Sequence, residues 1–122
     1  MKPLVLIKDR RFFDVLNQYN LIRIVVGDLL TVEQYTTMGH IHKFGSCFST
    51  QLATEFGVNK SAITSIINRL VERQLVERNN DPNDRRTIYL SLTDDGKDLF
   101  LRLDRKLREL VQPVIYMIIK RK

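Results

Sequence analysis

The stretch from Ser49 to Leu75 restricts the fold more than any other, because its residue types fit two short helices that meet at a sharp turn. Ser49 can cap the first helix with its hydroxyl oxygen, and Ala53 leaves room for a close helix crossing. Gly57 can enter the left-handed conformation that ends a helix, and Asn59 can cap the next one. The second helix carries apolar residues at helical spacing: Ile63, Ile66, Ile67 and Leu70. Residues 49–75 are therefore predicted to form a helix-turn-helix.

The second helix of this motif is predicted to expose a polar stripe. Its members are Lys60, Ser61, Thr64, Ser65, Asn68 and Arg69. Hydroxyl and amide groups can exchange hydrogen bonds with base edges, while lysine and arginine can reach phosphates. On an arbitrary amphipathic helix, such a stripe is usually a solvated face. Here the preceding turn is of the kind that presents a recognition helix, so the six residues are predicted to bind the major groove of DNA.

A β-hairpin is predicted to follow at residues 76–92, directly after the second helix. Leu75 to Arg78 fit a short strand, and Thr87 to Leu92 alternate between apolar and polar residues, as a half-buried strand does. The segment between them, Asn79 to Arg86, is rich in Asn, Asp and Pro and is predicted to be a polar turn. A hairpin in this position is a wing.

Two arginines, Arg85 and Arg86, lie at the predicted tip of the wing. They are expected to enter a minor groove, because narrow A·T-rich segments attract arginine. Asp84 is expected to orient one arginine while the other reaches DNA. The alternative is a purely structural role, in which the arginines only pair with Asp81 and Asp84 to hold the turn.

The N-terminal part of the chain is predicted to hold two helices. Residues 1–30 fit a helix from about Asp9 that breaks near Gly27. A second helix begins at Thr31, which can form a capping box with Gln34. One face of this second helix presents Tyr35, Met38, Ile41 and His42.

The C-terminal segment, residues 96–122, is predicted to be one long helix with an apolar seam. Thr93 caps it, and Pro113 should interrupt and bend it, because proline removes one helical hydrogen bond. Neither this seam nor residues 1–30 can be covered by one small domain. A homodimer is the simplest source of a covering surface, so both segments are predicted to dimerise.

Length and charge agree with a single DNA-binding domain. The chain has 122 residues, a formal net charge of +6 and a pI of about 9.7, which suits an anionic partner. From Ser49 to Thr93, however, six basic side chains stand against five acidic ones, so the DNA prediction depends on the helix-turn-helix and not on bulk charge. Cys47 is the only cysteine, which excludes an intrachain disulfide, and neither a signal peptide nor a membrane span is visible. The protein is therefore expected in the cytoplasm.

Three stretches, LTVEQY, STQLATEFGVNKSAITSIINRLVERQLVER and DPNDRRTIYLSLTDDG, resemble the MarR family of bacterial winged helix-turn-helix transcription regulators. The resemblance spans about Leu30 to Leu110. It implies a mainly α fold with a small β-hairpin wing, with N- and C-terminal dimerisation helices, and a homodimer on a pseudo-palindromic site. The residues that it places at the major groove are Ser61, Thr64, Ser65 and Asn68, and those at the wing tip are Asp84 and Arg86. Two positions differ from the family pattern: Ser65, where many relatives have arginine, and Gln74, where glycine is usual.

The sequence therefore predicts a dimeric, sequence-specific DNA-binding transcription regulator that acts as a repressor, with no catalytic residues, metal or cofactor. In the family that it resembles, small aromatic compounds bind between the dimerisation helices and the winged domain, and Tyr35, Met38 and His42 could line such a pocket. The alternative is that these three residues are simply core. Two other functions stay open: a winged helix that binds another protein, and a regulator of the same fold that senses metal through His40 and His42 or oxidants through Cys47.

Overall fold

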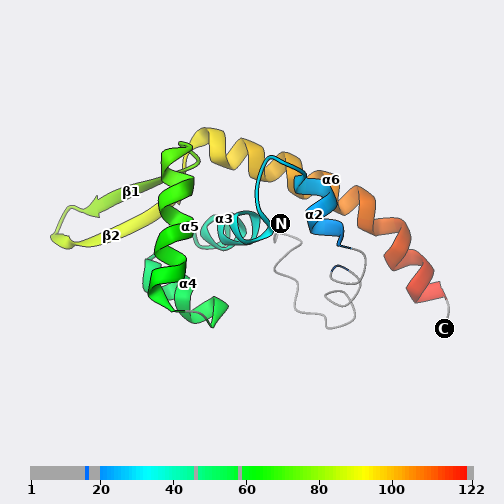
Figure 1. Ribbon diagram of the computed structural model, residues 1–122, viewed down its shortest axis with the longest axis horizontal. Helices are drawn as coiled ribbons and strands as arrows, with labels where there is room; N and C mark the ends of the chain where they lie inside the picture. The colour runs from blue at the N-terminus through cyan, green and yellow to red at the C-terminus, as the bar shows by residue number, and fades with distance from the viewer. Residues whose placement is uncertain (1–15, 17–19, 46, 58, 121–122) are drawn as a thin grey trace.

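The computed structural model describes residues 16, 20–45, 47–57 and 59–120. Its elements, in chain order, are α2 (Leu21–Val26), α3 (Val32–Phe44), α4 (Ser49–Phe56), α5 (Lys60–Glu72), β1 (Val76–Asp81), β2 (Asp84–Leu92) and α6 (Asp94–Lys120). The long helix α6 runs along one side of the molecule, and the hairpin of β1 and β2 projects from the end where α6 begins (Figure 1). The predicted fold class, mainly α with a helix-turn-helix and a small β-hairpin wing, is confirmed.

Helix α2 corresponds to the last part of the predicted N-terminal helix. Leu21 and Val26 are buried, and Gly27 ends the helix at the predicted place, with a φ of 53°. The predicted beginning near Asp9 lies outside the described residues. Helix α2 packs against α6 (Figure 1), so the described part of the N-terminal segment lies beside the C-terminal helix.

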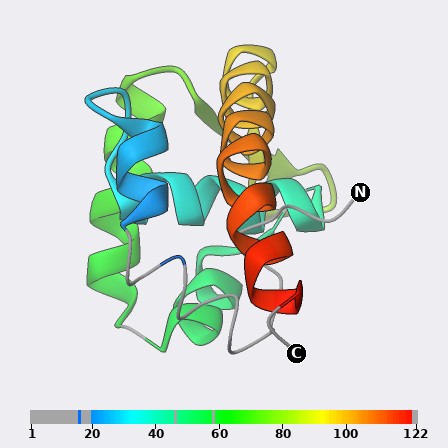
Figure 2. The same cartoon turned by 90° about the vertical axis from the view of Figure 1, so that its right-hand side faces the viewer.

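Helix α3 forms the centre of the core. It contacts α2, α5, α6 and β2, and it crosses behind α6 in the view of Figure 2. Its inward face carries Tyr35, Met38 and Ile41, each 0% exposed, and the Tyr35 ring stacks on Phe100 of α6 with centroids 5.1 Å apart. Burying a side chain of this size contributes about 1.5–3 kcal/mol. This packing fixes α5 and α6 relative to each other.

The predicted capping box of α3 is present. Thr31 Oγ1 accepts a hydrogen bond from the backbone N–H of Gln34 at 3.0 Å, and Gln34 Oε1 accepts one from the N–H of Thr31 at 3.0 Å. The pair satisfies two backbone donors that the first turn of a helix cannot satisfy itself. At the other end, Gly45 forms the C-cap with a φ of 74°.

The predicted N-cap of α4 is wrong by one residue. Ser49 is already the first helical residue, and Phe48 is the N-cap in an extended conformation. Gln51 Oε1 reaches back and accepts a hydrogen bond from the Phe48 N–H at 2.7 Å. The Phe48 ring also packs on Tyr89 of β2, with centroids 4.6 Å apart, and this contact fixes where the chain can enter the helix. A tertiary contact and a glutamine therefore decide the boundary in place of the serine hydroxyl.

The hairpin spans the predicted residues 76–92, but its strands are longer and its turn is tighter than the sequence predicted. The strands pair antiparallel as far as Asp81 and Asp84, so the predicted polar turn at residues 79–86 shrinks to Pro82 and Asn83. Asp81 Oδ1 accepts a hydrogen bond from the Asn83 N–H at 2.9 Å, which is the local bond that makes aspartate favourable in turns. The asparagines before the turn therefore belong to strand β1 and not to a loop.

The register of the hairpin is irregular near its tip. Asn80 pairs with Ile88, but the next residue of β1 pairs with Asp84, so residues 85–87 are extra residues on β2. Leu90 is buried at the base of the hairpin, whereas Ile88 is 45% exposed, so the predicted apolar face of this strand does not reach the tip. The backbone of Cys47 pairs with Leu90 through hydrogen bonds of 3.0 and 2.7 Å. This isolated antiparallel β-bridge beside strand β2 was not predicted from the sequence.

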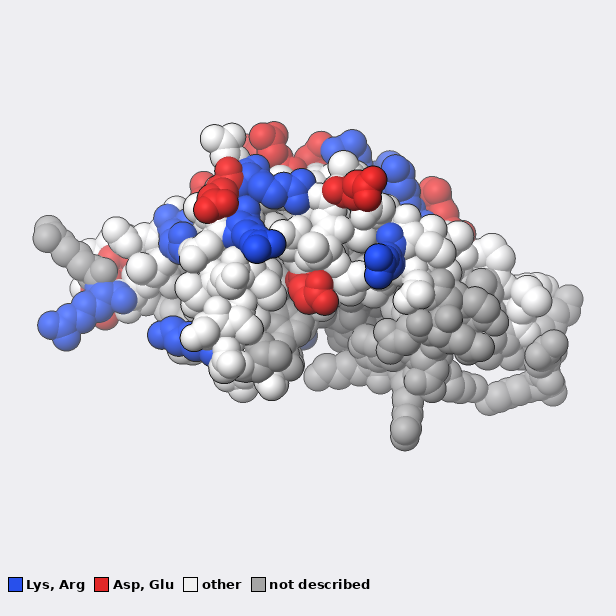
Figure 3. Space-filling view, viewed as in Figure 1, with Lys and Arg blue, Asp and Glu red and all other residues white. Residues whose placement is uncertain are grey.

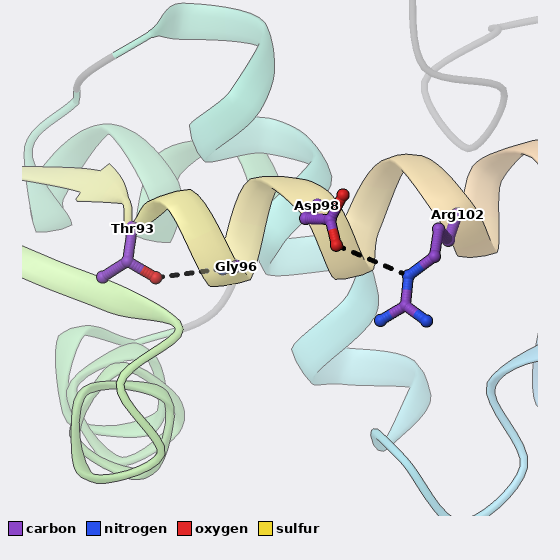
Figure 4. A network of polar contacts seen from close by, with 4 residues as sticks. All are labelled: Thr93, Gly96, Asp98 and Arg102. Carbon is purple, nitrogen blue, oxygen red and sulfur yellow. Dashed lines mark hydrogen bonds and ion pairs between the residues drawn. The ribbon is translucent and has the colours of Figure 1, made fainter.

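The start of α6 is held by Thr93, as predicted. Thr93 Oγ1 accepts a hydrogen bond from the Gly96 N–H at 2.9 Å (Figure 4) and donates one to the backbone oxygen of Gln74 at 2.7 Å. A Cβ atom at Gly96 would lie 2.0 Å from the backbone oxygen of Leu75, so this contact requires glycine. The end of α5, the base of the wing and the start of α6 therefore meet at one junction.

Helix α6 continues through Pro113, so the predicted interruption is wrong. Proline removes one intrahelical hydrogen bond, but Pro113 and Glu109, whose carbonyl loses that bond, are both exposed to water. The exposed pair of Asp98 and Arg102, 3.7 Å apart and one turn from the start (Figure 4), contributes at most about 1 kcal/mol. In the described part of the chain, no helix combines the length and the apolar content that a membrane span requires.

Candidate nucleic-acid interface

Helices α4 and α5 form the predicted helix-turn-helix. Gly57 ends α4 in the left-handed conformation (φ 63°, ψ 30°), as its position before the turn predicted. Asn59 caps α5, because its Oδ1 accepts a hydrogen bond from the Ala62 N–H at 2.8 Å. The inward face of α5 carries three buried apolar residues: Ile63, Ile67 and Leu70. This burial fixes which face of α5 points outward.

The outward face of α5 carries the six polar residues that were predicted from the sequence to be exposed. Lys60, Ser61, Thr64, Ser65, Asn68 and Arg69 are all exposed. The first five line one open depression along the helix. The polar stripe is therefore continuous, and none of its members is used to build the core. We call these six residues the polar stripe.

Two members of the polar stripe are already hydrogen-bonded inside the protein. Thr64 Oγ1 donates to the backbone oxygen of Lys60 at 2.8 Å, one turn back. Asn68 Oδ1 accepts a hydrogen bond from Nη2 of Arg78, which lies on β1. Sequence reasoning missed Arg78, because its partner is on another element and the spacing of either element alone gives no signal for this contact. The bond links the base of the wing to the polar stripe.

At the tip of the wing, Asp84 orients backbone and hydroxyl groups. Its Oδ1 accepts a hydrogen bond from the backbone N–H of Arg86 at 3.0 Å, and its Oδ2 accepts one from the Thr87 hydroxyl at 2.9 Å. Between the described side chains of Asp84 and Arg86, the structure has no ion pair, so Asp84 positions Arg86 through its backbone. The Arg86 side chain is exposed, and the Arg85 side chain lies outside the described part. The predicted wing-tip pair therefore consists of a carboxylate and an amide N–H.

Gln74 sets the direction in which the wing leaves α5. It has a positive φ of 60°, the conformation that the glycine of the family pattern adopts easily. Its N–H donates to the Val71 oxygen at 2.9 Å, and the N–H of Leu75 donates to the Leu70 oxygen at 3.0 Å. These two bonds form a Schellman motif, and Leu70 and Leu75, the positions where an apolar contact usually accompanies it, both belong to the buried core. The Schellman motif therefore forms in this chain without a glycine.

Basic and acidic side chains are mixed over the surface. In Figure 3, basic side chains project at the hairpin end of the molecule with acidic side chains beside them, and both kinds also alternate along α6. The polar stripe adds two exposed cations, Lys60 at the start of α5 and Arg69 near its end. Cations at these places can reach phosphates on either side of a groove that α5 enters.

The three residues predicted to line a ligand pocket lie in or beside the core. Tyr35 and Met38 are fully buried, and burial raises the pKa of Tyr35. His42 is half-buried, with its ring 5.4 Å from that of Phe100, and burial followed by the charge of Lys97 lowers its pKa. This is the environment of core residues. A pocket between them stays a prediction.

The geometry does not support oxidant sensing by Cys47 or metal sensing by His40 and His42. Cys47 is 1% exposed, and burial raises the pKa of its thiol to about 11, which keeps it protonated and unreactive at neutral pH. Within the described residues, no three His, Cys, Asp or Glu side chains are grouped closely enough to hold a metal ion. His40 and His42 are therefore not joined by a third ligand in the described part of the chain.

Comparison with known proteins agrees with this geometry. Residues 30–88 match the MarR family model. The chain is similar to the transcriptional regulator YhbI of Bacillus subtilis, with 36% identity over 70 residues, which cover 57% of this chain and 46% of that protein. It is also similar to the transcriptional repressor MdtR of the same organism, with 36% identity over 67 residues, which cover 55% of this chain and 43% of the repressor. The chain thus matches less than half the length of either relative.

A solved structure shares the fold. It is a MarR mutant from E. coli in complex with operator DNA, with a TM-score of 0.63 and 26% identity, covering 83% of this chain and 71% of the other. The family match covers α3, the helix-turn-helix and most of the wing. From this match and the shared winged helix-turn-helix fold, the chain is similar to the MarR family over residues 30–88.

Proposed function

We propose that this chain is a dimeric, sequence-specific DNA-binding transcription regulator that acts as a repressor on a pseudo-palindromic operator. The observation that carries the proposal is the polar stripe of α5, which is exposed while the opposite face of the same helix is buried. The major groove is about 12 Å wide and accepts a helix presented in this way. The similar MarR structure bound to operator DNA and the similar repressor MdtR support the same function.

In this mechanism the polar stripe reads base edges and the wing contacts the flanking minor groove. Ser61, Thr64, Ser65 and Asn68 face the bases, while Lys60 and Arg69 neutralise phosphates. Arg86, on the irregular end of the hairpin, enters the minor groove, where a narrow groove concentrates negative potential. Repression requires nothing more than occupation of a promoter.

The dimer supplies the second half of the site. Large apolar side chains remain exposed on α2, on the turn after it and on α6: Ile24, Leu29, Leu110 and Met117. Ile24 is 62% and Met117 63% exposed, which suits surfaces that a second copy covers. Two copies must place their α5 helices about 34 Å apart to enter successive major grooves. A small aromatic ligand that alters this distance would release the DNA, and the half-buried His42 is the accessible member of its predicted pocket.

The test is a binding selection followed by a salt titration. The full chain is incubated with a pool of random duplex DNA, and the enriched sequence is used to measure affinity between about 50 and 200 mM salt. We expect a palindromic enriched sequence and a steep loss of affinity with salt, because phosphate contacts release counterions. Arg69→Ala should reduce the salt slope by about one, whereas the matched control Arg102→Ala, on α6, should leave it unchanged.

Two outcomes would contradict the proposal. A pool without any enriched sequence would mean that the polar stripe does not read bases, and the exposed stripe would then serve another partner. A chain that sediments as a monomer while binding DNA would contradict the dimer and the spacing argument.

A further inference from the structure

Arg78, at the base of the wing, is bonded to the polar stripe. Its Nη2 donates a hydrogen bond to Oδ1 of Asn68, and both residues are exposed. Helix α5 contacts β1, and the hairpin extends sideways from the end of α5 (Figure 1). The polar stripe and the wing therefore form a corner, which the bond between Arg78 and Asn68 spans.

The register of the hairpin shows which face of the wing borders this corner. Arg78 pairs with Leu90, and opposite residues of an antiparallel pair share a face. Asn80 and its partner Ile88, two residues nearer the tip, lie on the same face. Leu90 is buried in the core, whereas Arg78 and Ile88 are exposed. This face, which we call the inner face of the wing, therefore leaves the core at Arg78 and continues toward the tip.

The Arg78 side chain is oriented without being neutralised. Its partner Asn68 is an uncharged acceptor, and no carboxylate of the described residues forms an ion pair with Arg78. The adjacent Glu77 lies on the opposite face, where its Oε1 accepts a hydrogen bond from the Ser91 hydroxyl at 3.4 Å. A guanidinium has five N–H donors, so others remain after the bond to Asn68. The charge of Arg78 is therefore available to an anion.

The structure of B-DNA decides which part of the duplex meets this corner. One sugar–phosphate strand separates each major groove from the neighbouring minor groove. With α5 in the major groove and Arg86 in the adjacent minor groove, that strand must cross between the polar stripe and the inner face of the wing. Arg78 is the only lysine or arginine in residues 76–80 and 88–92, which form the paired part of the wing. It is therefore the cation that the crossing strand meets.

We infer that Arg78 binds a phosphate of the strand between the two grooves, and that Asn68 is the positioning residue that holds the guanidinium for this contact. The planar guanidinium matches the oxygens of a phosphate. Because Asn68 orients it before DNA arrives, less side-chain freedom is lost on binding. The inference rests on the proposed DNA-binding function and adds one phosphate contact with the residue that positions it.

A purely structural bond, which only fastens the wing to α5, would behave differently. It would affect the shape and stability of the protein, but it would release no counterion from DNA. A phosphate contact adds to the salt dependence of binding and strengthens binding to every sequence equally. The salt slope and the order of base preference therefore separate the two roles.

The experiment uses the full chain and the duplex that it enriches from a random DNA pool. Fluorescence anisotropy gives the affinity of the wild type, Arg78→Gln, Arg78→Lys and the matched control Arg102→Gln between about 50 and 200 mM salt. We expect Arg78→Gln to weaken binding about tenfold and to reduce the salt slope by about one. Arg78→Lys, which keeps the charge, and Arg102→Gln should keep the wild-type slope. An unchanged slope for Arg78→Gln would overturn the phosphate contact.

A double variant tests the positioning role. Asn68→Ala is measured both in the wild type and in Arg78→Gln. If Asn68 acts through Arg78, the loss of affinity caused by Asn68→Ala should be about threefold smaller once Arg78 has been replaced. Equal losses in the two backgrounds would overturn the positioning role.

A second measurement uses the wild type alone and so does not depend on how the variants fold. Each phosphate of the enriched duplex is replaced in turn by a neutral methylphosphonate, and single-base substitutions locate the major groove that the protein reads. One phosphate in each half-site, on the strand between that groove and the flanking minor groove, should weaken binding about tenfold when it is neutral. Unchanged affinity at every phosphate of this stretch would contradict the inference.

The outcomes distinguish the inference from the proposed function. If the wild type enriches no sequence, the proposed function is wrong and the inference falls with it. If the wild type enriches a sequence, but Arg78→Gln keeps the wild-type salt slope or changes the order of base preference, the inference alone is overturned.

Discussion

Gln74 offers the sharpest test of the backbone geometry, because one substitution should stabilise the protein. It adopts a φ of 60°, and the hydrogen bonds that hold it are made by its backbone: its N–H donates to Val71, and its oxygen accepts from Thr93. The side chain is exposed, so replacing it removes no core contact. Gln74→Gly should therefore relieve conformational strain without loss of packing.

The size of the effect follows from two opposing terms. A residue with a Cβ atom in the left-handed region costs about 1–2 kcal/mol relative to the right-handed helix. Glycine avoids that cost but has more freedom to lose on folding, which is worth about 0.5–1 kcal/mol. The free energy of unfolding of Gln74→Gly should therefore increase by about 0.5–1 kcal/mol, which corresponds to a rise in Tm of about 2–5 °C for a chain of this size.

Urea unfolding followed by circular dichroism, at a fixed protein concentration, measures this difference. Gln74→Ala is the matched control, since it removes the same side chain but keeps the Cβ atom and the strain. We expect the alanine variant to match the wild type within about 0.5 kcal/mol. If the glycine variant is no more stable than the alanine variant, the turn does not hold Gln74 in the left-handed region and the reasoning is refuted.

Four further predictions address the junction, the wing tip and the buried thiol. Gly96→Ala should lower the free energy of unfolding by about 1–3 kcal/mol in urea titrations, because its Cβ would meet the Leu75 oxygen at 2.0 Å; an unchanged midpoint would contradict this contact. Thr93→Val should cost about 1–2 kcal/mol through the lost cap and the lost bond to the end of α5, while Thr93→Ser should retain most of the stability; equal losses would argue against the hydroxyl. Arg86→Ala should weaken binding to all DNA sequences in anisotropy measurements without changing the order of preference; a changed order would assign it a base contact. Burial raises the pKa of the Cys47 thiol from 9.0 to about 11, so the folded state favours the neutral thiol. The free energy of unfolding that this contributes is present below pH 9 and is lost as the pH rises to 11. Cys47→Ala should lack this part of the pH dependence of stability, and identical pH profiles for the variant and the wild type would refute the prediction.

Local signals in the sequence predicted the caps that depend only on neighbours. Thr31 with Gln34, and Asn59 before α5, were predicted correctly because the donor and acceptor lie within one turn of the same chain. Ser49 was predicted wrongly because Gln51 and the contact of Phe48 with Tyr89 move the start of α4. A serine at a helix start is therefore a good signal only where no tertiary contact competes.

Features that join distant elements could not be predicted from periodicity. The bond between Arg78 and Asn68 depends on the angle at which the wing leaves α5, and that angle is set by the Schellman turn. The β-bridge between Cys47 and Leu90 depends in the same way on how the segment between α3 and α4 lies beside the hairpin. The polar stripe itself was predictable, because the helical period alone separates it from the buried isoleucines.

The junction at Thr93 and Gly96 couples the position of the far end of α6 to the orientation of the helix-turn-helix and the hairpin. A helix of 27 residues is roughly 40 Å long, so a tilt of about 5° at one end displaces the other end by about 3.5 Å. The backbone of α6 contacts Leu75, and its capping residue Thr93 is hydrogen-bonded to Gln74. The helix-turn-helix and the hairpin are therefore expected to move together with this end of α6. A contact at the far end of α6 can therefore change the orientation of the helix-turn-helix, the proposed DNA-binding end, without touching it.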